Sequence, residues 1–259
     1  MRLTIKEKTK VTQLVAIFRY LKNITEIVNI NFSTDQLYIQ GLDSSHACLV
    51  EIKIMADWFD SYTSDTLTLG VSCGILFKVI DCWKEKQEIT LEYDSDDMDR
   101  LCINFKGEGT LTKDFALPLL DIDTDILEIP ESEYQVDLAM ASNLFNELIS
   151  EMAIFNDTIK FNCNEDSVSL SANGEAGEMK TIINNDDIEE LAIEEDFELD
   201  VNISTSYVVK TCAFHKLNPV VYIHCSNDRP VKIHYSLGDD DSIESTSYVR
   251  FFIATKIDD

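Results

Sequence analysis

The chain has 259 residues, of which 45% are hydrophobic, and carries a formal net charge of −27 at pH 7. This hydrophobic share excludes a disordered chain, and no apolar run reaches the roughly 18–20 residues that a membrane-spanning helix needs. Taken as a sum, the acidic excess speaks against binding to nucleic acid, because phosphate contacts require clustered Lys and Arg. The length allows one large domain or two of roughly 120 residues, each with its own core.

The first half of the chain alternates between short strands and two helices. In chain order, we expect a strand at Leu3–Ile5, a helix at Lys10–Lys22, strands at Val28–Phe32, Gln36–Gln40 and Ala47–Ile54, a helix at Cys73–Lys84, and strands at Ile89–Tyr93, Leu101–Phe105 and Leu111–Leu117. The stretch from Pro118 to Glu133 has no clear period and contains two of the four prolines. It therefore reads as a connector between domains.

The same order of elements then returns. We expect a strand at Tyr134–Met140, a helix at Ala141–Phe155, strands at Thr158–Cys163, Val168–Ala172, Met179–Ile183 and Phe197–Ile203, a helix at Thr205–Lys216, and strands at Val220–Cys225, Val231–Tyr235 and Tyr248–Ile253. Ser142 is the expected N-cap of the third helix. The acidic runs Asp94–Asp99 and Asp186–Asp200 are expected to be solvated loops or faces.

Many short alternating strands and only four helices predict an α+β fold, in which antiparallel sheets carry helices on one face. We expect two similar domains, residues 1–117 and 135–259, joined by a connector at 118–134. An internal repeat supports this division, because a helical stripe in the first half recurs 131 residues later in the second. The stripe is formed by Leu14, Ile17, Phe18 and Leu21, and its counterpart by Phe145, Leu148, Ile149 and Met152. A duplicated domain favours a symmetric assembly over an enzyme cleft.

Seven cysteines, an odd number without C-x-x-C spacing, favour buried thiols over disulfides or a zinc site. The first residues, Met1 to Glu7, lack the apolar core of a signal peptide. We therefore expect an intracellular protein with no membrane partner.

Motifs for metal, nucleotide or nucleophilic chemistry are incomplete. Asp121–Asp125 resembles the start of an EF-hand loop, but Ile126 stands where Gly is required and Ser132 where a bidentate Glu is required. No phosphate-binding glycine motif opens a helix. Asp43–His46 contains an acid, a hydroxyl and an imidazole, yet sequence neighbours rarely form a triad, and a turn is favoured. We expect no enzyme and no cofactor.

The basic residues gather on the predicted helices. They are Arg19 and Lys22 on the first helix, Lys78 and Lys84 on the second, and Lys210 and Lys216 on the fourth. Two interpretations remain open: solvated surface lysines, or helices that line a channel and concentrate positive charge there. The third helix breaks the pattern because its charged residues are Glu147 and Glu151.

Several segments, matched in order and spacing, resemble the proliferating cell nuclear antigen (PCNA) family of DNA sliding clamps. They are Leu42–Val50, Phe59–Tyr62, Asp121–Asp123 with Ile129–Glu131, Leu170–Glu175 and Ala254–Asp259. The resemblance covers essentially the whole chain. It implies a homotrimeric ring of two-domain subunits, with the basic helices facing duplex DNA in the central hole and the acid outside.

This family resemblance also implies the partners. The ring would serve as a processivity factor for a DNA polymerase and a docking platform for replication and repair proteins, in the nucleus or at a viral replication site. An ATP-dependent clamp loader would open it, since the chain has no ATPase motif. Peptides of the PIP-box type, with a Gln and paired aromatics, would bind a groove formed by Leu42, His46, Ala47, Leu49, Leu127, Ile129, Pro230, Phe252, Ala254 and Ile257.

Subunit contacts, again by resemblance, would pair the edge strand Leu111–Leu117 with Met179–Ile183 of a neighbour. The residues assigned to this interface are Lys113, Phe115, Met152, Phe155, Met179 and Ile182. Two alternatives share the fold: one subunit of a heterotrimeric checkpoint-type clamp, and an acidic interaction protein that no longer encircles DNA.

Four positions depart from the family pattern. Thr255 stands where the family usually has Pro, which predicts a less rigid tail. Asp81 and Glu147 replace bases on the channel helices, which predicts low DNA affinity with steep salt sensitivity. Glu165 replaces a modifiable Lys, which argues against ubiquitin-controlled lesion bypass.

Overall fold

The computed structural model describes residues 1–94, 99–130, 133–237 and 246–256. Some positions singled out above therefore lie outside the described residues. They are Ile257 of the predicted groove, Ser132 of the rejected EF-hand loop, residues 95–98 of the acidic run, and Glu131, Asp258 and Asp259 of the segments that resemble the family.

The described residues of the first half form two helices, one 3-10 turn and nine strands. In chain order they are β1 (Arg2–Ile5), α1 (Lys8–Leu21), β2 (Ile27–Phe32), β3 (Gln36–Leu42), β4 (Cys48–Met55), η1 (Ala56–Trp58), β5 (Ser61–Thr63), β6 (Leu67–Ser72), α2 (Cys73–Ile80), β7 (Glu88–Glu92), β8 (Arg100–Lys106) and β9 (Lys113–Pro118).

The second half repeats this order with small changes. Its elements are β10 (Val136–Ala141), α3 (Ser142–Met152), β11 (Thr158–Asn164), β12 (Ser167–Gly174), β13 (Gly177–Ile183), η2 (Asn185–Asp187), β14 (Ile188–Ile193), β15 (Leu199–Ser204), α4 (Thr205–Cys212), η3 (Ala213–Lys216), β16 (Val220–Cys225), β17 (Val231–Ser236), β18 (Tyr248–Ile253) and β19 (Thr255–Lys256).

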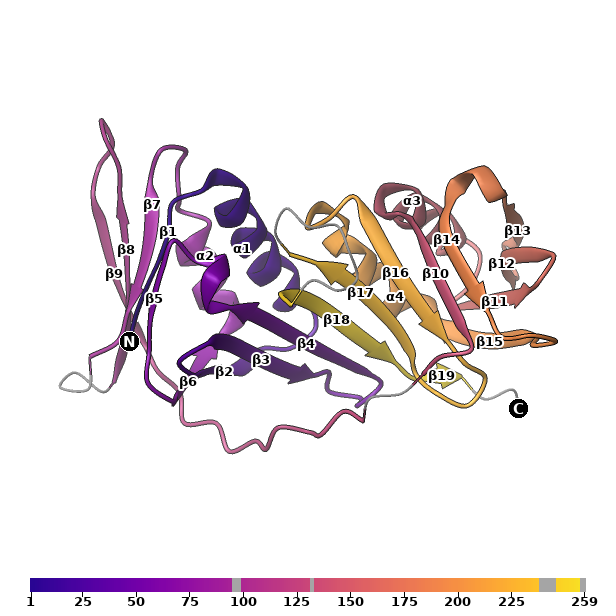
Figure 1. The fold of residues 1–259 in the computed structure, drawn as a ribbon, viewed down its shortest axis with the longest axis horizontal. Coiled ribbons are helices and arrows are strands. Elements are labelled where there is room, and N and C mark those ends of the chain that lie inside the picture. Colours follow the sequence, from indigo (N-terminus) through magenta and orange to yellow (C-terminus); the bar gives the residue numbers. More distant parts are fainter. Residues whose placement is uncertain (95–98, 131–132, 238–245, 257–259) are drawn as a thin grey trace.

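The strands form three antiparallel sheets, two of them belonging to one half each and the third shared by both. The outer sheets have the orders β5-β1-β7-β8-β9 and β13-β12-β11-β15-β19, and the shared one has the order β14-β10-β16-β17-β18-β4-β3-β2-β6. The pairing of β4 with β18, which sets Val50 opposite Phe251, carries the hydrogen-bond ladder from one half to the other. Figure 1 shows this shared sheet running through the middle of the molecule.

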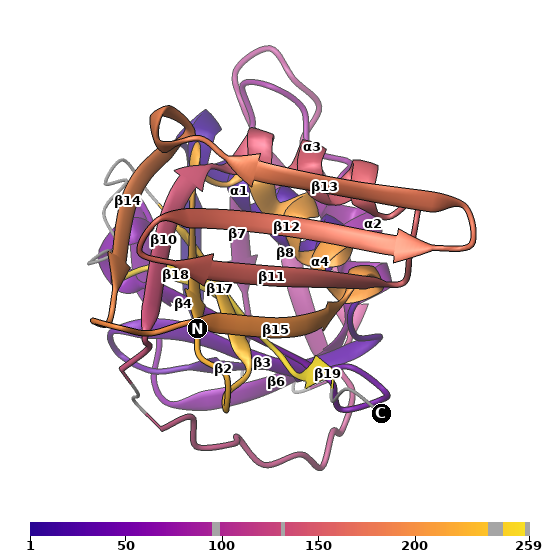
Figure 2. The same ribbon diagram turned by 90° about the vertical axis from the view of Figure 1, so that its right-hand side faces the viewer.

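The four helices gather away from the connector. Helix α1 packs against α2, and α3 against α4. Figures 1 and 2 show the connector along the lower border of the molecule, with the helices in its upper part. Helices α1 and α3 bury the apolar stripes that the repeat predicts: Leu14, Ile17, Phe18 and Leu21 on α1, and Phe145, Ile149 and Met152 on α3. Leu148, the remaining member of the predicted α3 stripe, is partly buried.

Three details differ from the sequence-based expectation. Helix α2 ends at Ile80, and α4 gives way to a 3-10 turn after Cys212. Ser142 is the first residue of α3 and not its N-cap, because its hydroxyl donates to the carbonyl oxygen of Asn218 at 2.6 Å. That bond holds the start of α3 to the chain before β16.

Strands β5, β6 and β14 are among those that the sequence-based expectation omits, and β14 lies in the acidic run Asp186–Asp200 that was expected to form a solvated loop or face. Strand β14 pairs with β10 at the edge of the shared sheet, with a register shift at Ala139 and Met140. Its Ile188, Leu191 and Ile193 are half-buried, while the acidic side chains between them are exposed. An edge strand can carry acidic side chains on its exposed face. Because acidic residues outnumber apolar ones across the run Asp186–Asp200, the strand cannot be recognised from composition.

Candidate functional site

Hydrogen bonds attach the connector to the first half along much of its length. The Leu120 amide donates to the carbonyl oxygen of Gly70 (2.9 Å), and the Asn29 side-chain amide donates to that of Ile122 (3.0 Å). A Cβ at Gly70 would lie 2.2 Å from the Leu120 oxygen, so only glycine permits this approach. Further along, the Gln40 side chain accepts from the Leu127 amide (2.8 Å) and donates to its carbonyl (3.0 Å).

An apolar groove of about 510 Å³ opens beside the last of these attachment points. It is lined by Leu42 of β3, by His46, Ala47 and Leu49 in and after the β3–β4 turn, by Leu127, Glu128, Ile129 and Pro130 of the connector, and by Tyr134, Arg229, Pro230, Phe252 and Ala254 of the second half. The pairing of Leu49 with Phe252 across β4 and β18 brings the two halves together here. A concave apolar lining of this kind suits aliphatic and aromatic side chains.

The turn between β3 and β4 is organised by one buried carboxylate, that of Asp43, which is 5% exposed. It accepts hydrogen bonds from the amides of Ser45 (2.9 Å), Ala47 (2.8 Å) and Cys48 (2.7 Å), and from the hydroxyl of Tyr207 (2.8 Å). Burial alone would raise the pKa of Asp43, but these hydrogen bonds outweigh burial and hold the pKa well below its usual value. The predicted turn is confirmed.

A chain of polar side chains lies beneath the connector and crosses between the halves. Gln40 Nε2 donates to the Tyr38 hydroxyl (3.2 Å), which donates to Glu51 Oε1 (3.1 Å). Glu51 Oε2 lies 4.0 Å from Arg250 Nη1, and Arg250 Nε donates to His234 Nδ1 (2.9 Å). Burial, reinforced by the charge of Arg250, lowers the pKa of His234 to about 2 and keeps its ring a neutral acceptor.

Among the described residues, β9 and β13 each end a sheet and have one open edge. Figure 2 shows β13 at the upper border of its sheet. Ile154 and Ile182 lie at the β13 end of the molecule, and their side chains are 70% and 60% exposed. Few other large apolar side chains among the described residues are as exposed. Unpaired edges with exposed apolar residues are typical of surfaces that pair with another chain.

The charged groups of the basic helix residues Arg19 and Lys22 contact different partners. Arg19 Nη2 lies 2.8 Å from Asp81 Oδ1, with both side chains about half exposed. Lys22 Nζ stands 4.3 Å from the centre of the Phe77 ring. Asp81 therefore offsets part of the positive charge that Arg19 brings to α1.

Family models for the two PCNA domains match nearly the whole chain. The N-terminal domain model of proliferating cell nuclear antigen matches residues 6–127, and the C-terminal domain model matches residues 128–256. The chain belongs to the PCNA family of sliding clamps. The predicted resemblance and the α+β clamp fold are thereby confirmed.

The relatives have low sequence identity to this chain, but each alignment covers most of both proteins. The chain is 29% identical over 246 residues to the proliferating cell nuclear antigen of Chaetomium thermophilum, covering 92% of both chains. It is 28% identical over 244 residues to the probable DNA polymerase sliding clamp 2 of Paramecium bursaria Chlorella virus 1, covering 94% of this chain and 87% of that one. It is 26% identical over 246 residues to the proliferating cell nuclear antigen of Caenorhabditis elegans, covering 92% and 91%.

The residues carried over from the PCNA family lie in three regions of the structure. Every described residue assigned to the groove lines the cavity beside the connector. Of the six helix bases, Lys84 lies beyond the end of α2, Lys216 closes η3, and Lys78 and Lys210 lie within α2 and α4. Lys84, Lys216 and Lys78 are exposed, and Lys210 is half-buried, with its Nζ 5.3 Å from the centre of a Tyr207 ring.

The residues assigned to the subunit interface need one correction. Met152 is wholly buried in the core beneath α3 and offers no surface to a neighbour. Phe115, Phe155 and Met179 are partly buried, Ile182 is exposed, and Lys113 Nζ donates to the Cys82 carbonyl (2.6 Å) within its own half. Ile154, just beyond the end of α3, is 70% exposed, whereas Met152 belongs to the apolar stripe that the sequence already assigned to the core.

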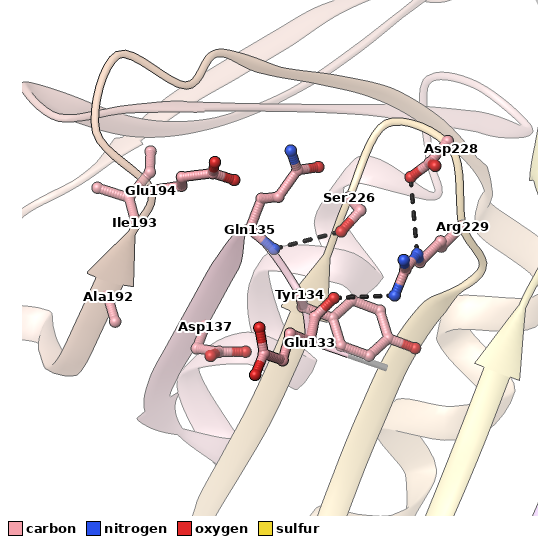
Figure 3. A pocket seen from close by; sticks show the side chains of 10 residues that line it. All are labelled: Glu133, Tyr134, Gln135, Asp137, Ala192, Ile193, Glu194, Ser226, Asp228 and Arg229. Carbon is pink, nitrogen blue, oxygen red and sulfur yellow. Dashed lines mark hydrogen bonds and ion pairs between the residues drawn. The ribbon is translucent and has the colours of Figure 1, made fainter. Parts of the chain in front are cut away.

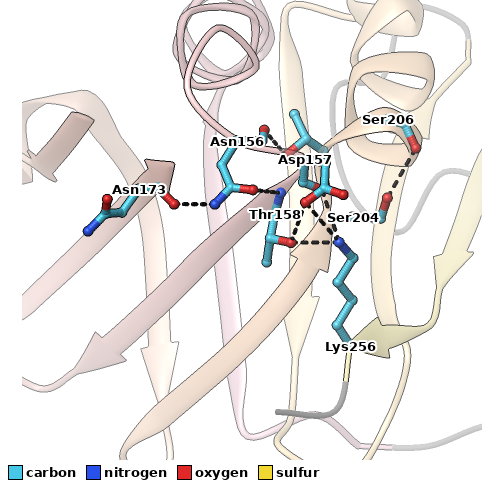
Figure 4. Close-up of polar contacts among 8 residues, drawn as sticks. Asn156, Asp157, Thr158, Asn173, Ser204, Ser206 and Lys256 are labelled. Atoms are coloured by element: carbon cyan, nitrogen blue, oxygen red, sulfur yellow. Dashed lines mark hydrogen bonds and ion pairs between the residues drawn. The ribbon is translucent and has the colours of Figure 1, made fainter. Parts of the chain in front are cut away.

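The described part of the C-terminal segment is bonded to the second half. β19 pairs with β15, and Lys256 Nζ donates to the Thr158 hydroxyl (2.6 Å) and lies 3.3 Å from Asp157 Oδ1. Figure 4 shows Lys256 reaching these residues at the start of β11. The lower rigidity expected from Thr255 stays a prediction.

A second cavity, of about 540 Å³, adjoins the groove and shares Tyr134 and Arg229 with it. Figure 3 shows its lining, which comes from the start of β10, the end of β14 and the β16–β17 turn. Arg229 Nη1 donates to the Glu133 carbonyl (2.9 Å), and Arg229 Nε lies 3.8 Å from Asp228 Oδ1. Sequence reasoning missed this cavity because it missed β14.

The described residues contain neither a candidate metal site nor a helix that could span a membrane. No group of three or more His, Cys, Asp and Glu side chains is placed to hold a metal ion there. No helix in that part of the chain is long and apolar enough to span a membrane.

Proposed function

We propose that this chain is a DNA sliding clamp: a homotrimeric ring that encircles duplex DNA, keeps a DNA polymerase on its template and docks other replication and repair proteins. The observation that carries the proposal is the groove, built by both halves and the connector in a member of the PCNA family. Its apolar lining suits the paired aromatic residues of PIP-box-type peptides. Binding of this kind needs no catalysis and no cofactor.

The division into two domains follows the connector. We take residues 1–117 and 135–259 as the domains and 118–134 as the connector, since the described part of 121–130 contains no helix or strand. The boundary between the two family matches, after residue 127, falls inside this connector.

Ring closure would use the two open edges. β9 of one subunit would pair with β13 of the next, and the same contact repeated head to tail closes a ring of three. Phe115 and Met179 on these strands, with Phe155, Ile154 and Ile182 nearby, supply apolar surface for the contact. A clamp loader would open the ring, because the chain lacks a nucleotide-binding motif of its own.

The channel would hold DNA weakly. Arg19 forms an ion pair with Asp81, which offsets its positive charge, and the exposed Glu147 of α3 adds a negative charge. Fewer phosphate contacts lower the affinity, but the slope of log affinity against log salt also scales with their number. We therefore replace the steep salt dependence expected above with a shallow one.

Static light scattering across a dilution series tests the assembly. A stable species of three times 29.5 kDa, about 88 kDa, is expected. A persistent monomer would contradict the homotrimer and favour a subunit of a heterotrimeric clamp or a protein that no longer encircles DNA. We further propose that the clamp acts in a nucleus or at a viral replication site, which the eukaryotic and viral sources of its relatives support.

Charge reversal tests the channel separately from assembly. Lys78→Glu together with Lys210→Glu is expected to abolish stimulation of a polymerase while leaving the trimer intact. Undiminished stimulation by this double variant would refute a DNA-facing role for α2 and α4.

A further inference from the structure

We propose that Tyr207, on helix α4, is a positioning residue for the peptide groove: its hydroxyl holds, through Asp43, the turn that presents His46 and Ala47 to a docked peptide. This inference rests on the proposed function of the groove. Tyr207 itself does not line the groove. Tyr207 is 164 residues from Asp43 along the chain and belongs to the second half, whereas the turn belongs to the first.

The turn is held from both sides. On one side, the Ala254 amide donates to the Ala47 carbonyl (2.9 Å), which ties the turn to the end of β18. On the other, the Tyr207 hydroxyl donates to Asp43 Oδ2 (2.8 Å) and also contacts the Ser45 hydroxyl. The turn therefore sits between a strand and a helix of the second half, although its own residues belong to the first.

The conformation of the turn explains why it needs such support. His46 has a φ of 59°, in the left-handed region that non-glycine residues adopt at a cost. Asp43 stabilises this backbone by accepting from the amides on either side of His46, those of Ser45 and Ala47. A carboxylate can do so only while its oxygens stay aimed at these amides.

Tyr207 helps to hold the Asp43 carboxylate in this orientation. Asp43 Oδ2 receives both the Tyr207 hydroxyl and the Ser45 donors, whereas Oδ1 receives the amides of Ala47 and Cys48. Removing the tyrosine hydroxyl takes away the donor that comes from outside the turn at Oδ2. The carboxylate and the His46 backbone then gain freedom, and a docked peptide must restore their order at the expense of affinity.

The first test compares three proteins for binding of a fluorescein-labelled peptide with a Gln and paired aromatics, by fluorescence anisotropy. Tyr207→Phe removes only the hydroxyl, and we expect about fivefold weaker binding, the size expected for one charge-assisted hydrogen bond acting in part. Tyr62→Phe is the matched control, because its hydroxyl also makes two hydrogen bonds, to the carbonyls of Ser33 (2.9 Å) and Gln36 (2.6 Å), away from the groove. Tyr62→Phe should leave the peptide affinity unchanged.

A double-mutant cycle distinguishes positioning from general loss of stability. If Tyr207 acts through the turn, Tyr207→Phe should weaken binding clearly less in a His46→Gly background, where the left-handed φ costs little. Equal effects in both backgrounds, or equal losses for Tyr207→Phe and Tyr62→Phe, would overturn the inference. Failure of the wild-type protein to bind the peptide would instead refute the proposed groove function, so the two failures are distinguishable.

Discussion

Gln40 is the side chain that fixes the connector beside the groove, and replacing it tests the groove's architecture directly. Its amide makes two hydrogen bonds to the backbone of Leu127, at 2.8 and 3.0 Å. Both are exposed to solvent, so each contributes about 0.5–1 kcal/mol, within the lower half of the range for a protein hydrogen bond. Gln40→Ala should therefore free this part of the connector by about 1–2 kcal/mol, or about 5–30-fold in its local opening equilibrium.

Amide hydrogen exchange measures the opening itself. The Leu127 amide, which donates to Gln40 Oε1, should exchange about 5–30-fold faster in the variant. Peptide affinity should fall by up to about tenfold, because the docked peptide must then order the connector. Amides of the shared sheet, such as that of Val50, should not change.

Gln36→Ala is the control, since it makes the same substitution at the other end of β3 and leaves the connector bonds in place. The reasoning would be refuted if Gln40→Ala left both the exchange of Leu127 and the peptide affinity at wild-type values. Faster exchange with unchanged affinity would also refute it, by showing that the peptide does not depend on the connector's position.

Three other predictions concern the channel, the turn and the interface. Asp81→Lys should prolong retention on DNA and steepen the log–log salt slope by about 0.9 for each further phosphate that the protein neutralises, and an unchanged slope would show that this position does not face DNA. The pKa of Asp43 is lower in the folded protein than in the unfolded one, so its contribution to the free energy of unfolding is complete above about pH 4 and is lost as the pH falls through the folded-state pKa. The free energy of unfolding, measured with urea, should therefore fall less steeply with decreasing pH for Asp43→Asn than for wild type, and parallel curves would contradict this. Ile182→Glu should yield monomers in light scattering, whereas Cys102→Ser, an exposed change on the outer sheet, should remain trimeric.

The interface correction could have been made from the sequence. Met152 belongs to the apolar stripe of α3 and is buried, whereas Ile154 lies two residues beyond the end of the helix and is 70% exposed. The 3.6-residue period of the stripe already assigns Met152 to the core, while its interface role came from the family resemblance. The direction of Ile154 could not be predicted in the same way, because residues beyond the end of a helix leave the helical period.

The helices, most of the strands, the duplicated α+β layout and the family could be predicted from the order of the amino acids. These follow from local information: apolar periods of 3.6 and 2 residues, turn chemistry, and segments such as Leu42–Val50 that match the family pattern. Three other features emerged from the fold alone: the pairing of β4 with β18, the contact of Tyr207 with Asp43, and the ion pair of Arg19 with Asp81. Each of these joins residues at least 60 positions apart, and no local period records which distant side chain will meet a given donor or charge, because that depends on how the two halves pack.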